Sequence, residues 1–484
     1  MSFHRCLSLP GLVQPVAVLP GLLTGGRRLA QSRSSPGARR TKEAPLSRGE
    51  GSLPAGVPTP AIRREIPFLV GTAGIMLLLF GYYAYTWRSF FGFASAIDTC
   101  VGLFCDFVSF YFPMGGAIFR TALPVAGYVY SPFNAILLSV FPPLGLAASI
   151  TVWGVLQALA IAAYILLFRR LVPAGLPVQL LFVTLVLSSF PILHNVAWGQ
   201  VGIFTTVAIL AVLSLYEQRR LVAAAAALAF AVSFKFFPLI FLAPFVARRD
   251  TRFLMLAVLA CGACLLLIPG VLLGYGDTLR FYAALFDSYR DMTWVVGNYN
   301  SQHFPHVALR LARAAEHDWS PYLPLLRAIS YGIAAANLGL VFRVQKRRLL
   351  HADLLSFHVL FLTIPFVMST SWPVDLAYLP FVQSLVAWRV LRRPEAPGAS
   401  DTGVSPGANG SPSRTHRARK AVTILLLLLS ITVSNAVFFN MAGDRFRYGF
   451  LGFQFWANLL LLAATYVLLI PSLQERMTSE AVAF

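Results

Sequence analysis

Residues 221–247 read LVAAAAALAFAVSFKFFPLIFLAPFVA, and Lys235 is the single charged side chain in this apolar stretch. Two basic pairs enclose it, Arg219-Arg220 before it and Arg248-Arg249 after it. A lone ammonium at membrane depth costs at least a few kcal/mol, so a membrane protein that keeps one usually uses it. The stretch therefore predicts a functional lysine between two short apolar helices.

The composition of the whole chain places this stretch in a membrane protein. Of the 484 residues, 57% are hydrophobic and 12% are charged, whereas about a quarter of the residues in a soluble chain are charged. We expect an all-α polytopic membrane protein with about ten full transmembrane helices plus a re-entrant or broken helical hairpin. Seven apolar runs are about long enough to cross a hydrocarbon core of about 30 Å: 66–86, 145–168, 176–193, 201–216, 253–274, 353–368 and 421–440. Three further runs are less regular: 326–342, 374–388 and 448–470.

The net charge of +20 is carried by basic clusters at the ends of these runs, which argues against a nucleic-acid partner. If Arg63-Arg64 lies in the cytoplasm and each full-length run crosses once, every cluster is cytoplasmic, as the positive-inside rule requires. This placement of the basic clusters requires that 221–247 does not cross the membrane. Its two arms, of about 21 and 18 Å, are each too short to cross. We therefore predict a hairpin that enters from the cytoplasm, turns at 233–237 and carries Lys235 at its apex.

The chain divides by composition into four parts. We predict a basic disordered N-terminal tail, a transmembrane catalytic core with two long outer loops, a flexible cytoplasmic linker, and a C-terminal transmembrane helix pair with a short tail. Their bounds are 1–62, 63–393 with loops 87–131 and 275–325, 394–418, and 419–484. A transit peptide or an over-extended start are the alternatives for the tail. Cys100 and Cys105 share a predicted outer loop and could form a disulfide if that compartment is oxidising.

The outer loops hold the candidate chemistry. Asp106 lies among aromatic residues of the first loop, where a carboxylate loses hydration, which suits a general base; the alternative is a helix cap or an ion pair. The other candidates are amides, a histidine and a tryptophan of the kinds that bind sugar hydroxyls: Asn195, Gln200, Asn298, Asn300, Gln302, His303 and Trp372. His303 and His306 suggest a metal pair only weakly. We predict no metal ligands and no required cofactor, and a divalent metal is not excluded.

These groups all fall on one side of the predicted topology. A buried ammonium suits the phosphate of a lipid carrier, because it binds as a compact point charge. One carboxylate base and one cation suffice for sugar transfer from such a donor, whereas a glycosidase needs two carboxyl groups. The combination predicts a membrane glycosyltransferase that uses a lipid-phosphate sugar.

The same residues carry a family likeness over about residues 66–390. The chain resembles glycosyltransferase family 87 of the GT-C superfamily, whose members include polyprenyl-phosphate-sugar-dependent mannosyl- and arabinofuranosyltransferases. The motifs are Asp106-Phe107 with Tyr111, Tyr130-Ser131-Pro132, Asn195 with Trp198-Gly199-Gln200, Lys235 with Pro238, Asn300-Ser301-Gln302 with Arg310, and Ser369 with Trp372. The chain departs from the family in having Pro373-Val374-Asp375 where a histidine often follows the tryptophan, and in the order of residues 300–302.

The resemblance implies roles for particular residues. Asp106 would be the catalytic base, Lys235 would bind the donor phosphate with help from Arg280 or Arg310, and Tyr130 would contact substrate. It also implies transfer of a hexose or pentose from a polyprenyl-phosphate donor to an envelope glycan or glycolipid acceptor. The enzyme would lie in the inner membrane of a bacterium, with its site facing the periplasm or the cell exterior and membrane lipid around it.

Two other function classes fit parts of the sequence. A transporter or lipid flippase also uses broken helices and a buried lysine, although the two halves of the chain show no matching repeat. A non-catalytic membrane scaffold is the second alternative. It should tolerate substitution of Asp106 and Lys235, whereas the enzyme should not.

Overall fold

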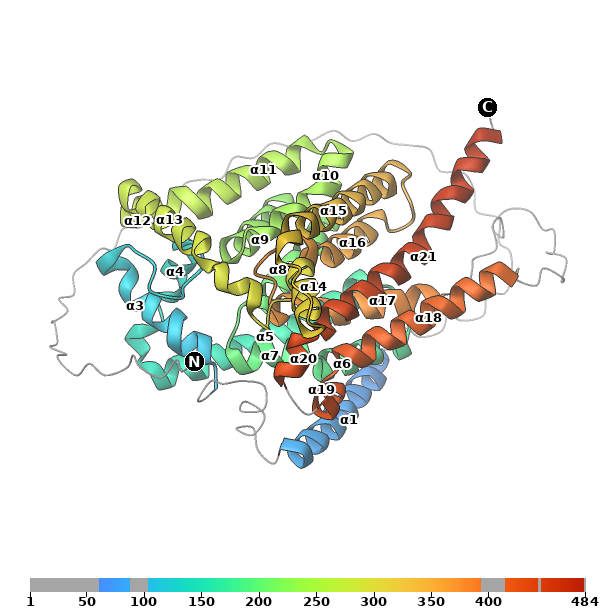
Figure 1. The fold of residues 1–484 in the computed structure, drawn as a ribbon, viewed down its shortest axis with the longest axis horizontal. Helices are drawn as coiled ribbons and strands as arrows, with labels where there is room; N and C mark the ends of the chain where they lie inside the picture. Colours follow the sequence, from blue (N-terminus) through green and yellow to red (C-terminus); the bar gives the residue numbers. More distant parts are fainter. Residues whose placement is uncertain (1–60, 88–102, 393–413, 443–444, 483–484) are drawn as a thin grey trace, which may run out of the picture. The chain divides into compact units, whose positions relative to one another are not determined.

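The computed structural model describes residues 61–87, 103–392, 414–442 and 445–482, and all of their regular structure is helical apart from one isolated bridge between Ser189 and Asn435 (Figure 1). Cys100 and most of the predicted tail and linker lie outside these residues.

The first half contains α1 Ala61–Trp87, η1 Phe107–Tyr111, α3 Phe112–Thr121, α4 Pro132–Leu138, η2 Pro142–Leu144, α5 Leu146–Leu171, α6 Leu176–Ser188, α7 Phe190–Trp198, α8 Gly202–Glu217, α9 Leu221–Phe234, η3 Phe237–Leu242 and α10 Ala243–Arg248. The second half contains α11 Thr251–Gly262, η4 Ala263–Leu267, α12 Ile268–Leu273, α13 Tyr275–Arg290, η5 Met292–Gly297, α14 Phe304–Ala314, η6 Ser320–Tyr322, α15 Leu323–Lys346, α16 Ala352–Val367, η7 Pro373–Leu376, α17 Leu379–Leu391, α18 Arg414–Ser434, α19 Ala436–Ala442, α20 Arg445–Phe450 and α21 Phe453–Val482.

The described helices are those of an integral membrane protein. Six are long and apolar enough to cross a membrane, and α7 and α8 form one further candidate span bent by 119°. The expected all-helical class is therefore confirmed, but about ten full spans are not. The difference arises because an apolar run does not reveal where its backbone breaks: the run 176–193 is divided at Ser189, and α6 has 13 residues.

The predicted break at Lys235 is confirmed. Helix α9 ends at Phe234, and Lys235 has an extended backbone with φ −148° and ψ 145°. Pro238 stands near the start of η3, where a residue without an N–H is tolerated. The returning arm differs from the expected helix, because it consists of the six-residue 3₁₀ turn η3 followed by the six-residue helix α10. The side from which this hairpin enters the membrane remains a prediction.

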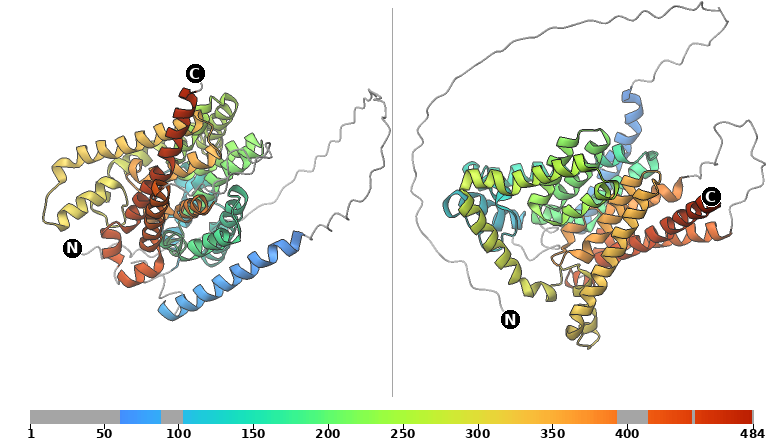
Figure 2. Two further views of the ribbon diagram at one scale, coloured as in Figure 1. Left: turned by 90° about the vertical axis from the view of Figure 1, so that its right-hand side faces the viewer. Right: turned by 90° about the horizontal axis from the view of Figure 1, so that it is seen from above.

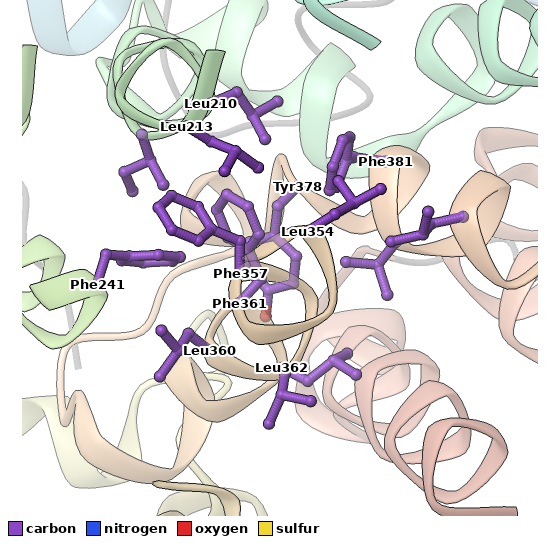
Figure 3. Packing of buried hydrophobic residues seen from close by; sticks show 14 of the residues in the cluster. Leu210, Leu213, Phe241, Leu354, Phe357, Leu360, Phe361, Leu362, Tyr378 and Phe381 are labelled. Atoms are coloured by element: carbon purple, nitrogen blue, oxygen red, sulfur yellow. The ribbon is translucent and has the colours of Figure 1, made fainter. Parts of the chain in front are cut away.

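The hydrophobic core surrounds α16 and α17, whose side chains are almost all buried. Phe241 of η3 packs edge-on against Phe361, and Phe361 stacks on Tyr378 with ring centroids 5.0 Å apart (Figure 3). By contrast, α1 lies along the outside of the helices (Figure 2) and exposes apolar residues such as Leu77 and Leu78. Exposed apolar faces of this kind are suited to contact with lipid.

The two predicted outer loops contain short helices. The first includes η1 and α3 and is followed directly by α4, and the second includes α13, η5 and α14. Ser131 caps α4 by accepting a hydrogen bond from the backbone N–H of Asn134 at 3.3 Å. These short elements bring their ends, and the side chains at those ends, toward the breaks in the longer helices.

Candidate active site

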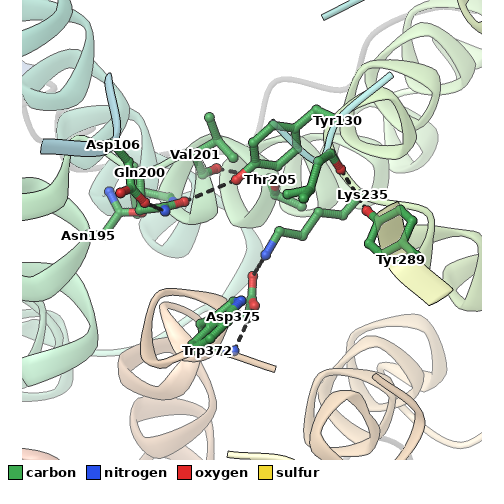
Figure 4. Close-up of polar contacts among 12 residues, drawn as sticks. Asp106, Tyr130, Asn195, Gln200, Val201, Thr205, Lys235, Tyr289, Trp372 and Asp375 are labelled. Carbon is green, nitrogen blue, oxygen red and sulfur yellow. Dashed lines mark hydrogen bonds and ion pairs between the residues drawn. The ribbon is translucent and has the colours of Figure 1, made fainter. Parts of the chain in front are cut away.

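The candidate site is assembled where helices break. Asp106 directly precedes the π-helical turn η1, Gln200 occupies the bend between α7 and α8, and Lys235 separates α9 from η3. Tyr130 lies just before α4, and Asp375 belongs to the 3₁₀ turn η7 (Figure 4). Breaks of this kind, including π-helical turns, often occur at functional sites.

Asp106 is held by Gln200. The side chain of Asp106 is buried, and the Gln200 amide nitrogen Nε2 donates a hydrogen bond to its Oδ2. The other end of the amide, Oε1, accepts from Tyr111 Oη at 2.9 Å and from Tyr130 Oη at 3.2 Å, while the two hydroxyl oxygens lie 2.8 Å apart. An ionised carboxylate only accepts hydrogen bonds, whereas a phenol can donate or accept, so Gln200 presents its N–H group to Asp106 and its carbonyl oxygen to the tyrosines.

The bend that carries Gln200 is built by helix α5. Trp153 Nε1 donates to the Gly199 carbonyl at 2.9 Å, and Gln157 Nε2 donates to the Gln200 carbonyl at 2.7 Å. Gly199 has φ +66°, and a Cβ there would lie 2.8 Å from the Cβ of Phe104, so glycine is required on both counts. Phe107 stacks on Trp153 with centroids 4.7 Å apart. The same helix therefore positions both Asp106 and Gln200.

Lys235 has a buried partner. Its Nζ donates to Asp375 Oδ1 at 2.6 Å, with side-chain exposures of 10% for Lys235 and 1% for Asp375. Asp375 Oδ2 accepts from the Trp372 N–H at 3.0 Å, and the Asp375 N–H donates to the Trp372 carbonyl, also at 3.0 Å. The carboxylate is thus fixed to its own turn, whereas the ammonium stands at the end of a flexible four-carbon stem.

The carboxylate of Asp106 and the Lys235–Asp375 pair border one region. The Ser131 N–H donates to the Ser233 carbonyl at 3.3 Å, which joins the segment of Tyr130 to the end of α9. Burial, and then the negative charges of Asp106 and Asp375, raise the pKa of Tyr130 well above its usual value. Figure 4 shows the Lys235 side chain extending between Tyr130 and Asp375. A neutral phenol and an ammonium therefore separate two carboxylates.

Turn η7 is tightly packed against the start of α8. A Cβ on Gly202 would lie 2.2 Å from the Val374 carbonyl oxygen, so only glycine allows this approach. Tyr289 of α13 lies on another side of the site, near Lys235 (Figure 4), and its hydroxyl donates to the Val129 carbonyl at 2.6 Å. Burial, with the charge of Asp375 adding to it, raises the pKa of Tyr289 to about 12.

The predicted amide cluster of the second outer loop forms a separate structural unit. Gln302 is buried; its N–H donates to the Ser371 carbonyl at 2.6 Å, and its Oε1 accepts from the Phe455 N–H at 3.1 Å. His303 contacts the Pro365 carbonyl at 2.9 Å, and burial lowers the pKa of His303 to about 4. These contacts join the loop to α16 and α21, so they support the turn that carries Trp372 rather than contacting Asp106.

Both arginines predicted to bind phosphate have other contacts. Arg310 is buried and donates to the carbonyl oxygens of Asn298 at 2.8 Å and Ser301 at 2.6 Å, with two further carbonyls of α20 at 3.2 and 3.5 Å. Burial lowers the pKa of Arg310 to about 10. Arg280 has a side chain that is 73% exposed and pairs with Asp277 on its own helix. These positions favour a structural role for Arg310 and a surface role for Arg280.

Replacing Arg310 by methionine is expected to destabilise the protein, because each buried carbonyl left without a donor costs about 1–3 kcal/mol. Arg280→Met is the matched control and should melt like the wild type, since its side chain is largely exposed. Thermal unfolding of the purified proteins in detergent measures both. The structural role is wrong if Arg310→Met melts like the wild type while its affinity for donor falls.

A comparison with protein-family models identifies the family of the chain. The model of glycosyltransferase family 87 matches residues 128–370. The chain belongs to glycosyltransferase family 87. No curated protein and no solved structure matches it. The matched segment contains Tyr130, Gln200 and Lys235, whereas Asp106 and Asp375 lie outside it.

Family membership and the apolar helices together make this chain a glycosyltransferase of the membrane, which transfers sugar from a donor to an acceptor. Of the predicted site residues, the structure brings together Asp106, Tyr130 and Gln200, and places Lys235 next to the turn of Trp372. Asn195 supports the bend through Gln157 and the Ile203 N–H. Asn298 and Asn300 belong to the separate cluster.

Sequence reasoning missed three contributors to the site. The sequence does not identify Asp375 as the partner of Lys235, although an unpaired lysine in an apolar stretch implies an acidic partner elsewhere in the chain. Tyr111 was recognised as part of a motif but not as a partner of Gln200. Gln157 lies inside an otherwise apolar helix, and a buried amide there indicates a hydrogen-bonded role.

Proposed function

We propose that this protein transfers a hexose or pentose from a polyprenyl-phosphate donor to a glycan or glycolipid acceptor at the outer face of a bacterial inner membrane. The observation that carries the proposal is the buried carboxylate of Asp106, oriented by Gln200 and bordering the same region as the Lys235 ammonium. A base and a cation in one water-poor site are the two groups that transfer from a phosphate-linked sugar needs.

The proposed reaction is a single displacement. Asp106 accepts the proton of an acceptor hydroxyl as the hydroxyl oxygen attacks the anomeric carbon. The bond between that carbon and the phosphate oxygen breaks, and its electron pair leaves with polyprenyl phosphate. The phosphate gains negative charge in this step, so a nearby ammonium stabilises the transition state more than the bound donor.

The remaining residues have supporting roles in this mechanism. Gln200 presents its N–H group to Asp106, which holds the carboxylate in one orientation without supplying a proton acceptor of its own. The hydroxyl of Tyr130 stays protonated because its pKa is raised, and when it turns from Gln200 it can donate to a sugar or phosphate oxygen. Trp294 lies beside Trp372, with ring centroids 6.0 Å apart, and offers an exposed aromatic face for a sugar ring.

The proposal is tested by supplying purified protein in liposomes with a panel of labelled polyprenyl-phosphate sugars and, separately, nucleotide sugars. Membrane glycolipids serve as acceptors, and release of polyprenyl phosphate is measured alongside product. We expect turnover with one or a few of the polyprenyl-phosphate donors. Turnover with nucleotide sugars alone would overturn the donor class, and movement of an intact lipid or solute across the bilayer without transfer would favour a transporter.

A further inference from the structure

The Lys235–Asp375 pair poses a problem of charge for the proposed donor. Lys235, Asp375 and Asp106 together carry one net negative charge when all three are ionised. A sugar linked through a phosphodiester brings one more negative charge. An anion approaching this buried group meets an ammonium that a carboxylate already neutralises, so it gains little attraction unless the ammonium changes partner.

The two members of the pair are unequally held. Asp375 is anchored by hydrogen bonds to Trp372 in both directions and lies in a turn that packs on Gly202. Lys235 follows the end of α9 in an extended conformation, and Asp375 is the one hydrogen-bond partner of its ammonium among the described residues. If one member moves, the long lysine side chain is the one free to do so.

We propose that Asp375 is the resident counter-ion of Lys235, and that the phosphate of the donor displaces it. In the donor-free protein the pair keeps a buried ammonium neutralised. When the donor binds, the ammonium turns from Asp375 to the phosphate oxygen, while Asp375 keeps the hydrogen bond from Trp372. The exchange gives the phosphate an uncompensated cation. This inference rests on the proposed function, because it takes a phosphate-bearing lipid as the ligand.

The exchange makes a prediction opposite to that of a simple positioning role. If the ammonium lies on Asp375 for more than about nine-tenths of the time, removing this competitor lowers the apparent Kd for a phosphate about tenfold or more. If Asp375 instead positions the ammonium for the phosphate, its removal weakens binding. The sign of the change in affinity therefore decides between the two roles.

The experiment measures binding of farnesyl phosphate to purified protein in detergent, with farnesol as the probe that lacks the phosphate. Asp375→Asn is expected to bind farnesyl phosphate about tenfold or more tightly than the wild type, with no change for farnesol. Lys235→Met should bind farnesyl phosphate no more tightly than farnesol, because it leaves the Asp375 carboxylate without its cation. The double variant Lys235→Met/Asp375→Asn should bind the two probes equally. Asp353→Asn is the matched control, because it removes the acid of the Arg248–Asp353 pair at the opposite end of α16.

The other possible binding results overturn either the exchange alone or the exchange together with the proposed donor. Equal or weaker binding of farnesyl phosphate by Asp375→Asn, with loss in Lys235→Met, overturns the exchange and leaves the proposed donor intact. No preference for farnesyl phosphate over farnesol in the wild type or in Asp375→Asn overturns both. If Asp375→Asn does not fold, Asp375→Ser gives the same test, since serine removes the charge and keeps a capping oxygen.

Discussion

Replacing Asp106 by asparagine is expected to lower the rate of sugar transfer by about 10²–10⁴-fold, the usual contribution of a general base. The asparagine keeps the size of the side chain and its carbonyl oxygen can still accept the hydrogen bond from Gln200. The change therefore removes the proton acceptor and little of the packing. The rate is measured in liposomes with a saturating polyprenyl-phosphate sugar, and binding of donor should change much less than turnover.

The control for this substitution is Asp287→Asn on α13. Asp287 is also an acid of a predicted outer loop, but its side chain is 69% exposed and pairs with Arg290 of its own helix at 3.8 Å. The Asp287→Asn protein should transfer sugar at the wild-type rate. Full activity of Asp106→Asn, in protein that folds as the wild type does, would show that another group accepts the proton.

The break at Lys235 could be predicted from local sequence because the causes of the break are local. A charged residue in an apolar run, a nearby proline and basic pairs at both ends each restrict the same stretch. The number of full spans could not be predicted in this way. Apolarity shows that a segment prefers lipid or a core, but α16 is apolar and buried inside the protein rather than exposed at its surface.

The individual residues of the site could be predicted from the sequence better than the contacts between them. Asp106 and Lys235 are recognisable singly because a charged group among apolar residues is costly. Their partners lie 94 and 140 positions away along the chain, at Gln200 and Asp375. No periodicity connects residues at such separations, and only the packing of the helices brings them together. The contacts of Gln302 and Arg310 could not be predicted from the sequence for the same reason. Both side chains bind backbone carbonyls or N–H groups, which the sequence does not identify.

Replacing Lys235 by methionine is expected to have two separable effects. It leaves Asp375 as a buried carboxylate without its cation, which costs about 3–5 kcal/mol of stability. It also removes the cation proposed to stabilise the leaving phosphate, which should lower transfer by about 10²–10³-fold. Thermal unfolding measures the first effect, and the rate of polyprenyl phosphate release measures the second.

The double variant Lys235→Met/Asp375→Asn separates these effects, because the asparagine removes the unpaired charge. We expect it to regain most of the lost melting temperature, since two neutral side chains of similar size replace a buried ion pair at little cost. Transfer should stay at the level of Lys235→Met. If stability and transfer recover together, the lysine serves only to neutralise Asp375, and the cation that assists the departing phosphate must be another residue.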